Sequence, residues 1–215
     1  MYENIHTLII APHPDDEVIG CSILLNEQTL VVYFTNGDDG KAFYDNGTIV
    51  EDKNFLANLR ELEAIEVAKK TGIKQIFMKI SEKDIKEQTN LEMVFIRQRR
   101  QWMDRLHEIT RLCPNLKEIY TTHIHDRHPV HQAVSVIVSG WYFHECKIDG
   151  VKLFFYSIFP IDDWIAYQIC ELNEEDYQTK LDLLKTYKSQ WDDFLCRVVT
   201  QERPDDFKKE TFYVP

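Results

Sequence analysis

The run from Leu30 to Thr35 constrains the fold of this chain more than any other stretch. Its residues, Leu-Val-Val-Tyr-Phe-Thr, stay apolar up to the final threonine, whereas a strand with one face in water alternates apolar and polar side chains. Continuous apolar strands are typical of parallel sheets that helices cover on both faces. We therefore expect this run to be an inner strand of an α/β sheet.

The same alternation of strand and helix patterns continues along the chain. We predict further strands over 5–11, 73–80, 118–122 and 153–159, and helices over 18–26, 55–71, 91–112, 131–146 and 174–196. Residues 81–90 are charged and poor in apolar side chains, which predicts a loop or a frayed turn. Strands that alternate with helices predict an α/β fold, here a three-layer Rossmann-like sandwich with a mostly parallel central sheet. The length suits one domain over residues 1–215.

Composition argues against several kinds of partner. The formal net charge is −11, and the basic cluster at 97–100 fits a solvated helix face, so neither nucleic acid nor a membrane is the expected partner. The five cysteines are far apart and include no Cys-x-x-Cys pair, which argues against a cysteine metal site and a disulfide framework. The sequence shows no signal segment and no apolar run of transmembrane length, which predicts a cytoplasmic protein.

The turn expected after the first strand concentrates metal-binding and proton-transfer groups. Residues 11–17, Ala-Pro-His-Pro-Asp-Asp-Glu, hold one imidazole and three carboxylates between two apolar runs. One interpretation is a plain strand-to-helix turn whose acids cap the next helix. The other is a site in which His13 and Asp16 bind a metal while a further acid moves protons.

A second polar cluster follows the strand expected at 118–122. It contains His123, His125, Asp126, Arg127, His128 and His131. Since the carboxyl ends of parallel strands meet at one edge of a sheet, we expect this cluster to face the turn at 11–17. A catalytic zinc needs three protein ligands and one open position, and His13, Asp16 and one of the later histidines supply that set.

The later histidines divide into two pairs. We expect His123 and His125 to be strand-edge residues hydrogen-bonded to their neighbours. His128 and His131 instead flank a predicted helix start, so that one can bind the metal while the other faces substrate.

The stretch at 11–17 and the later His-Pro-Val-His at 128–131 resemble the motifs of the PIG-L / LmbE-like deacetylases. These are zinc hydrolases that remove acetyl groups from N-acetylglucosamine-type sugars. Three further segments agree with the family pattern in order and spacing, namely Thr35-Asn36-Gly37-Asp38, the run from Leu59 to Ala64, and Tyr187-Lys188-Ser189-Gln190. The resemblance covers most of the chain.

The resemblance implies a division of catalytic roles. His13, Asp16 and His131 would bind one zinc ion per chain, Asp15 would be the general base, and a protonated His128 would face the substrate carbonyl. Zinc lowers the pKa of a bound water toward about 7, and Asp15 would move a proton from that water to the leaving amine. Sites of this composition also accept iron, cobalt or manganese.

The resemblance also implies substrate-binding and supporting residues. Arg60, Asn36 and Asp38 would contact the substrate. Glu17 would hold the turn, and Asp126 would support the later histidines.

Val130 is a departure from the family pattern, which often has aspartate at this position. That acid is expected to orient and charge the neighbouring His128, and valine cannot do so. Asp126 or His125 is the expected substitute.

Arg60 and Glu63 form a charged pair in an otherwise apolar stripe of the helix expected at 55–71. Such a pair is either a buried ion pair or the lining of a pocket. The resemblance favours a pocket in which Arg60 reaches sugar hydroxyls or a substrate anion.

The aromatic residues are expected to divide between site and core. Phe43 and Tyr44, after the second strand, are candidates for stacking on a sugar face. The residues expected in the core are Trp141, Tyr142, Phe154, Phe155 and Trp164.

The sequence therefore predicts a zinc-dependent hydrolase that removes an N-acetyl group from an amino-sugar substrate. Two alternatives remain, a hydrolase of the same fold that acts on a non-sugar amide and a non-catalytic sugar-binding protein. The expected partner is a small molecule, and association into a homo-oligomer stays open because members of such families often associate.

Overall fold

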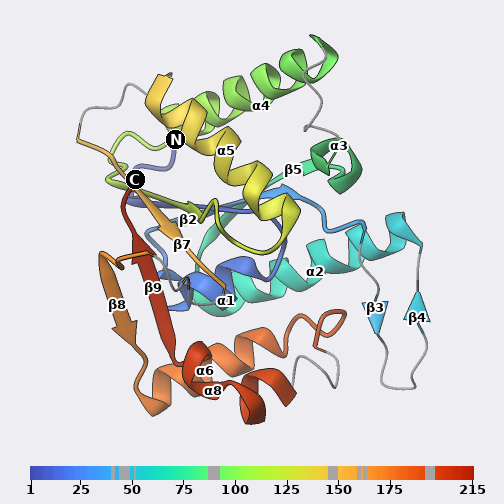
Figure 1. The fold of residues 1–215 in the computed structure, drawn as a ribbon, viewed down its shortest axis with the longest axis vertical. Helices are drawn as coiled ribbons and strands as arrows, with labels where there is room; N and C mark the ends of the chain where they lie inside the picture. Colours follow the sequence, from blue (N-terminus) through green and yellow to red (C-terminus); the bar gives the residue numbers. More distant parts are fainter. Residues whose placement is uncertain are drawn as a thin grey trace.

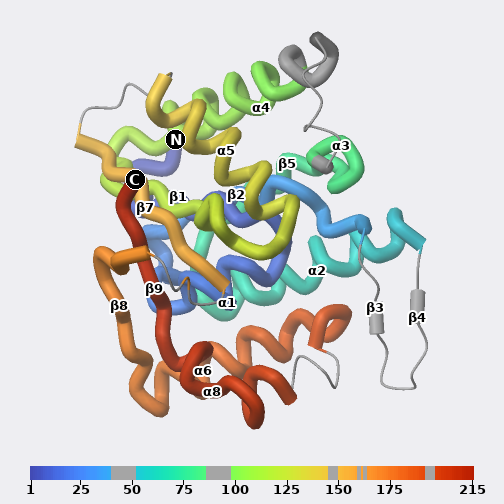
Figure 2. The backbone as a smooth tube through the Cα atoms, in the orientation of Figure 1, coloured from blue at the N-terminus to red at the C-terminus, as the bar shows by residue number. Residues whose placement is uncertain are grey.

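The computed structural model describes residues 1–39, 42–43, 49–50, 52–86, 93–144, 150–158, 161, 164–191 and 197–215, which Figure 2 shows in colour except at 42–43, 49–50, 86 and 93–97. Within these ranges, the side chains at 42–43, 49–50, 86 and 93–97 are left undescribed. The candidate sugar-stacking residues Phe43 and Tyr44 therefore lie outside the described side chains.

One seven-stranded sheet forms the centre of the molecule, in the order β5-β2-β1-β6-β7-β9-β8. The strands are β1 (Thr7–Ala11), β2 (Thr29–Thr35), β5 (Lys74–Ile80), β6 (Glu118–Thr122), β7 (Lys152–Tyr156), β8 (Gln168–Glu171) and β9 (Lys209–Tyr213). The first five in spatial order pair in parallel, and β9 is antiparallel to both of its neighbours. A separate short hairpin joins β3 (Ala42–Phe43) and β4 (Ile49–Val50).

Helices cover both faces of the sheet (Figure 1). They are α1 (Asp16–Cys21), α2 (Lys53–Thr71), α3 (Glu82–Lys86), α4 (Met93–Arg111), α5 (Pro129–His144), α6 (Glu174–Leu184) and α8 (Pro204–Phe207), with a 3-10 turn η1 (Ser22–Leu24) and a π-helical turn η3 (Val198–Glu202). Leu8 and Ile10 of β1 pack in a core cluster with α4 and α5. Ile9 and Ala11 belong to a second cluster with α1, α2 and α6.

These two clusters explain the continuous apolar run in β2. All seven residues of β2 are buried, because alternate side chains enter opposite helix layers. The predicted three-layer α/β sandwich with a mostly parallel sheet is confirmed.

Three local predictions were wrong. The segment at 81–90, predicted to be a loop or a frayed turn, contains the short helix α3, which forms because Asp38 accepts hydrogen bonds at its start and Ile85 is buried beneath it. The final helix ends at Leu184 instead of residue 196, where the chain turns and Tyr187 and Ser189 make tertiary hydrogen bonds. The strands β8 and β9 near the C-terminus were not predicted.

A buried ion pair fixes α6 to the sheet. Lys180 of α6 and Glu210 of β9 lie 3.0 Å apart with both side chains fully buried. Glu210 also accepts hydrogen bonds from the backbone N–H and the hydroxyl of Ser22, after α1. These contacts position the turn that follows α6 beside α1.

Among the described residues, no helix is long and apolar enough to cross a membrane.

Candidate metal centre

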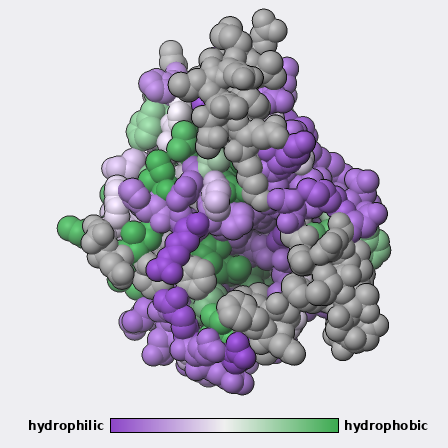
Figure 3. All heavy atoms as spheres, turned by 45° about the vertical axis from the view of Figure 1, so that its right-hand side comes forward, coloured by the Kyte–Doolittle hydropathy of each residue, from purple (hydrophilic) through white to green (hydrophobic). Residues whose placement is uncertain are grey.

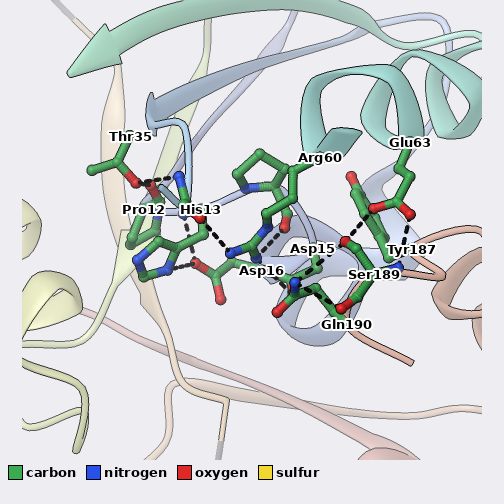
Figure 4. A network of polar contacts seen from close by, with 12 residues as sticks. Pro12, His13, Asp15, Asp16, Thr35, Arg60, Glu63, Tyr187, Ser189 and Gln190 are labelled. Atoms are coloured by element: carbon green, nitrogen blue, oxygen red, sulfur yellow. Dashed lines mark hydrogen bonds and ion pairs between the residues drawn. The ribbon is translucent and has the colours of Figure 1, made fainter. Parts of the chain in front are cut away.

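The turn between β1 and α1 is held from two neighbouring elements. Thr35, at the end of β2, donates from its backbone N–H and its hydroxyl to the Pro12 carbonyl at 2.9 and 2.8 Å. Arg60 of α2 donates to the Pro14 carbonyl at 2.7 Å. The backbone N–H of His13 donates to Asp16 at 2.8 Å. The turn is therefore a fixed platform at the carboxyl edge of the parallel strands (Figure 4).

Three predicted metal ligands meet above this platform, although one of them lies more than a hundred residues away in the sequence. His13 Nδ1 and His131 Nε2 are 3.1 Å apart, and each lies 3.2 Å from Asp16 Oδ2. We call these three atoms the donor triangle. All three residues are buried, with 6%, 3% and 5% of their surfaces exposed for His13, Asp16 and His131.

The donor triangle has the dimensions of a zinc site. Ligands about 2.0–2.1 Å from a tetrahedral zinc are about 3.3 Å from one another, close to the three observed distances. His128 lies beside the triangle, and the ligand atoms of His13, His128 and His131 fall within 4.8 Å of one another. The residues present therefore fit a metal, with Asp16 or His128 as the third ligand beside the two buried imidazoles.

The charges around the triangle favour a cation. Burial opposes the ionised form of Asp16, but His131 and His13 outweigh it and hold its pKa well below the usual range. Burial likewise opposes the charged form of His131, but Asp16 and Asp126 outweigh it and raise its pKa to about 10. Two acids thus create a strongly negative potential at this imidazole, the condition under which a divalent cation binds.

Asp15 adjoins the triangle in an unusual backbone conformation. Its φ of 119° is in the left-handed region, which costs a non-glycine residue of order 1–3 kcal/mol. Its carboxylate Oδ2 lies 3.0 Å from Arg60 Nη2. Burial raises the pKa of Asp15 to about 6, although the charge of Arg60 opposes this rise. A carboxylate with a pKa near neutrality is suited to accept and return a proton.

Arg60 contacts Asp15, and its proposed contact with substrate stays a prediction. The guanidinium is buried and also approaches the Gly37 carbonyl at 3.5 Å. Gly37 has a φ of +64°, and a Cβ atom there would lie 2.3 Å from Arg60 Nη1. A glycine at this position is what lets the guanidinium reach Asp15.

Glu63 does not form an ion pair with Arg60, which was one of the two interpretations of the charged stripe on α2. It accepts hydrogen bonds from the backbone N–H and the hydroxyl of Ser189, at 2.8 and 2.6 Å. Figure 4 shows the two α2 side chains pointing to different partners, Arg60 to Asp15 and Glu63 to Ser189. The segment after α6 is thereby joined to α2.

Glu17 connects the turn between β1 and α1 to the segment after α6. It is fully buried and accepts hydrogen bonds from the backbone N–H of Asp15, at 3.0 Å, and from the hydroxyl of Tyr187. Burial raises the pKa of Glu17 to about 7. Its carboxylate satisfies the backbone N–H of the strained residue Asp15.

Asp126 supports a different histidine from the one expected. Its Oδ1 lies 3.1 Å from His131 Nδ1 and accepts the backbone N–H of His128 at 2.9 Å. It therefore orients the candidate ligand His131 and fixes the main chain, not the ring, of His128. Burial, followed by the charges of His13 and His131, lowers the pKa of His128 to about 4, so its surroundings favour the neutral imidazole over the protonated form that we expected.

Val130 is part of the hydrophobic core. Its side chain is fully buried in the cluster formed with α4 and α5. At this position the chain uses an apolar contact with the core, and the nearby Asp126 carboxylate lies at His131 and not at the ring of His128.

The two predicted polar residues after β2 differ in their surroundings. Asp38 accepts hydrogen bonds from the Ser81 hydroxyl at 2.8 Å and the Glu82 backbone N–H at 2.9 Å, so it fixes the start of α3. Asn36 Oδ1 is buried and has no hydrogen-bond partner in the described part of the chain. Substrate contacts of both residues stay predictions.

One residue of the site was missed in the sequence. Glu82 is buried, with 4% of its surface exposed, and its Oε1 lies 3.5 Å from His13 Nε2. It falls in the segment predicted to be a charged loop. The signal that could have revealed it is the acid at the start of a short segment ending in the apolar Ile85.

His123 and His125 form a separate cluster. The backbone N–H of His125 donates to His123 Nδ1 at 3.2 Å, and the ring of His123 lies 4.6 Å from that of Trp164. The expectation of hydrogen-bonded strand-edge residues agrees with this arrangement. Trp164, expected in the core, is 41% exposed, whereas Trp141, Phe154 and Phe155 are buried and Tyr142 is partly buried.

The region that holds the donor triangle matches a known protein family. The family model described as "PIG-L: GlcNAc-PI de-N-acetylase" matches residues 8–142, which include the whole donor triangle. No curated protein sequence matches the chain at a significant level.

Three solved structures illustrate the likeness of the fold. An N,N'-diacetylchitobiose deacetylase from Pyrococcus horikoshii superimposes with a TM-score of 0.67 at 16% identity, over 98% of this chain and 83% of that one. The A40926 pseudoaglycone deacetylase gives 0.65 at 14% identity, over 99% and 97%. A 4-carboxy-2-hydroxymuconate hydratase from Pseudomonas putida gives 0.60 at 14% identity, over 98% and 97%.

Proposed function

Because the chain belongs to the PIG-L family of de-N-acetylases, we propose that it is a metal-dependent hydrolase that removes the N-acetyl group from an amino-sugar substrate. The products are acetate and the free amine. The observation that carries this proposal is the donor triangle with Asp15 beside it, since a metal ligand set and a proton-transfer group are the two parts that amide hydrolysis requires.

His13, Asp16 and His131 are the residues that we propose hold the metal. A bound divalent cation supplies Lewis acidity, which polarises an amide carbonyl and lowers the pKa of water. Zinc fits the donor set of two imidazoles and a carboxylate. Iron, cobalt and manganese accept similar sets.

Asp15 carries the proton in the proposed reaction. Its carboxylate accepts a proton from the attacking water as the new carbon–oxygen bond forms. The protonated carboxyl then donates that proton to the amide nitrogen as the carbon–nitrogen bond breaks, so that the amine leaves neutral. Arg60 holds Oδ2 of this carboxylate at 3.0 Å, which orients the group and favours its ionised form before the reaction.

His128 is the remaining imidazole at the site. In the proposed reaction it donates a hydrogen bond to the carbonyl oxygen as negative charge develops there. A neutral imidazole retains one N–H, so this role does not require the protonated form that its surroundings disfavour.

An amino-sugar substrate is supported by the names of the similar structures and by the polar character of the surface. Two of the three superimposed proteins are deacetylases of a chitobiose sugar and of a pseudoaglycone. Figure 3, in which the right-hand side of Figure 1 comes forward, shows mostly hydrophilic side chains on the coloured part of this face, with the hydrophobic ones in separate patches. The fold alone does not define the reaction, since it also occurs in a hydratase.

A panel of substrates tests the proposal. The zinc-loaded protein is incubated with N-acetylglucosamine glycosides and with N-acetylated amino acids, and free amine is measured. Release from the sugars alone supports the proposal, and release from the amino acids alone supports the alternative amidase. No release from any substrate, together with sugar binding, would leave a non-catalytic sugar-binding protein.

The Asp15→Asn variant is the matched control for the panel. It keeps the shape of the side chain but removes the base, and general-base catalysis typically contributes about 10²–10⁴-fold in rate. We expect a rate loss of this size with zinc still bound. Full activity in Asp15→Asn would contradict the proposed role of this residue.

A further inference from the structure

The two ring nitrogens of His13 face different partners. Nδ1 is a corner of the donor triangle, 3.2 Å from Asp16 Oδ2 and 3.1 Å from His131 Nε2. Nε2 lies 3.5 Å from Oε1 of Glu82. An imidazole that offers the Nδ1 lone pair to a metal carries its proton on Nε2, and Glu82 is an acceptor for that proton.

The Glu82 carboxylate is held in place by the segment around it. The backbone N–H of Glu82 donates to Asp38 at 2.9 Å, and the carboxylate atom Oε1 accepts the backbone N–H of Asp39 at 3.4 Å. The neighbouring Ser81 hydroxyl donates to the second oxygen of Asp38 at 2.8 Å. Because the turn after β2 and the start of α3 bind each other reciprocally, the carboxylate reaches His13 from a fixed position.

The other imidazole of the triangle has the same arrangement. His131 presents Nε2 to the triangle, and its Nδ1 lies 3.1 Å from Asp126 Oδ1. Each buried imidazole therefore has a buried carboxylate at its remote nitrogen, one from α3 and one from the loop before α5. Histidines that bind metals usually donate their other N–H to such a carboxylate or to a carbonyl, which fixes the tautomer and the orientation of the ring.

We propose that Glu82 is a positioning residue for the metal centre, which accepts the Nε2–H of His13 and so directs Nδ1 toward Asp16 and His131. The inference rests on the proposed function, because it assigns a role toward the metal of that site. It adds a residue from α3 to the site, outside the turn and the histidine cluster in which the ligands lie.

Zinc affinity is the primary test. Wild type, Glu82→Ala, Glu82→Gln and the matched control Ser81→Ala are titrated with zinc in competition with a fluorescent chelator. Loss of such a supporting residue typically weakens metal binding about 10–100-fold, and we expect a loss of this size in Glu82→Ala. Glu82→Gln, which keeps an oxygen acceptor but not the charge, should lose less.

The control separates this role from a structural one. Ser81→Ala removes one of the hydrogen bonds that hold the start of α3 but keeps the Glu82 carboxylate and the contact of its N–H with Asp38, so its zinc affinity should fall far less than that of Glu82→Ala. In ¹⁵N-histidine NMR spectra of the zinc-loaded wild type, the proton of His13 should reside on Nε2. In Glu82→Ala, activity should return at zinc concentrations that saturate the weaker site.

Two results would overturn the inference in distinguishable ways. Zinc affinities of Glu82→Ala and Glu82→Gln equal to that of wild type would refute the role of Glu82 and leave the proposed function intact. A wild-type protein that binds no zinc or other divalent metal would refute the proposed metal centre itself.

Discussion

Replacing Arg60 with alanine should lower the stability of the protein and shift the pH range in which Asp15, the base of the proposed reaction, is ionised. The Arg60 and Asp15 side chains are 6% and 13% exposed and meet at 3.0 Å. Removing one partner of a buried ion pair costs about 3–5 kcal/mol, because the other charge is left uncompensated. In a protein of this size each kcal/mol lowers Tm by about 2–4 °C, so we expect a decrease of roughly 6–20 °C.

The same substitution should shift the pH dependence of catalysis. Burial already raises the pKa of Asp15 to about 6, and the charge of Arg60 is the strongest influence that lowers it. Without that charge the pKa rises further, so the ionised base is lost at a higher pH. The acidic limb of the kcat/KM profile should therefore move toward higher pH in Arg60→Ala.

A double-mutant cycle isolates the contact. Unfolding is measured for Arg60→Ala, Asp15→Asn and the double variant at saturating zinc, and neighbours in direct contact usually show coupling of about 0.5–3 kcal/mol. Arg60→Lys serves as the control that keeps the charge but not the two-pronged guanidinium, and it should give an intermediate loss. If Arg60→Ala raised KM and left Tm unchanged, the ion pair with Asp15 would not be what Arg60 contributes, and the side chain would belong to the substrate pocket.

Three further substitutions have definite expected outcomes. Gly37→Ala places a Cβ atom 2.3 Å from Arg60 Nη1 at a φ of +64°, so Tm and kcat should both fall, whereas a wild-type rate would show that Arg60 can move without consequence. Val130→Asp buries a carboxylate in the apolar core and should lower the free energy of unfolding, measured with denaturant, by several kcal/mol. Val130→Thr is the milder control. A Val130→Asp protein as stable as wild type would contradict the buried placement of this side chain. Tyr187→Phe removes a hydrogen bond to the buried Glu17 and should lower the free energy of unfolding, measured by urea titration, by about 1.5–3 kcal/mol. An unchanged free energy of unfolding would mean that another group replaces the phenol.

The features that the sequence predicted are those that follow from local pattern. The unbroken apolar run of β2 predicted a covered parallel sheet, and a parallel sheet brings the ends of β1 and β6 to one edge. The histidine cluster after β6 could therefore be expected to face the turn at 11–17, and the family resemblance singled out His131, which lies 118 positions from His13. No knowledge of individual contacts was required for this part of the site.

The features that the sequence did not predict depend on contacts between distant segments. The hydrogen bonds from Ser81 and Glu82 to Asp38 span more than forty residues, so α3 appeared to be a charged loop. The helical pattern after Glu174 continued through Ser189, but the hydrogen bonds of that residue to Glu63 outweigh local helix propensity.

The partners of individual charged groups were equally hidden. The stripe on α2 placed Arg60 near Glu63, yet helical spacing alone could not show that Arg60 reaches Asp15 instead. Asp126 was expected to serve His128, and only the three-dimensional arrangement shows its carboxylate at His131. Which acid orients which imidazole depends on distances that no sequence period encodes.

A zinc titration of catalytic activity would show whether the proposed hydrolysis depends on a metal at the donor triangle. The protein is first treated with a chelator, and the release of free amine from an N-acetylglucosamine conjugate is then measured as zinc is added in steps. We predict no release without metal and a rise that saturates at one zinc ion per chain. Amine release that persists in the chelator, or none at any zinc concentration, would contradict it.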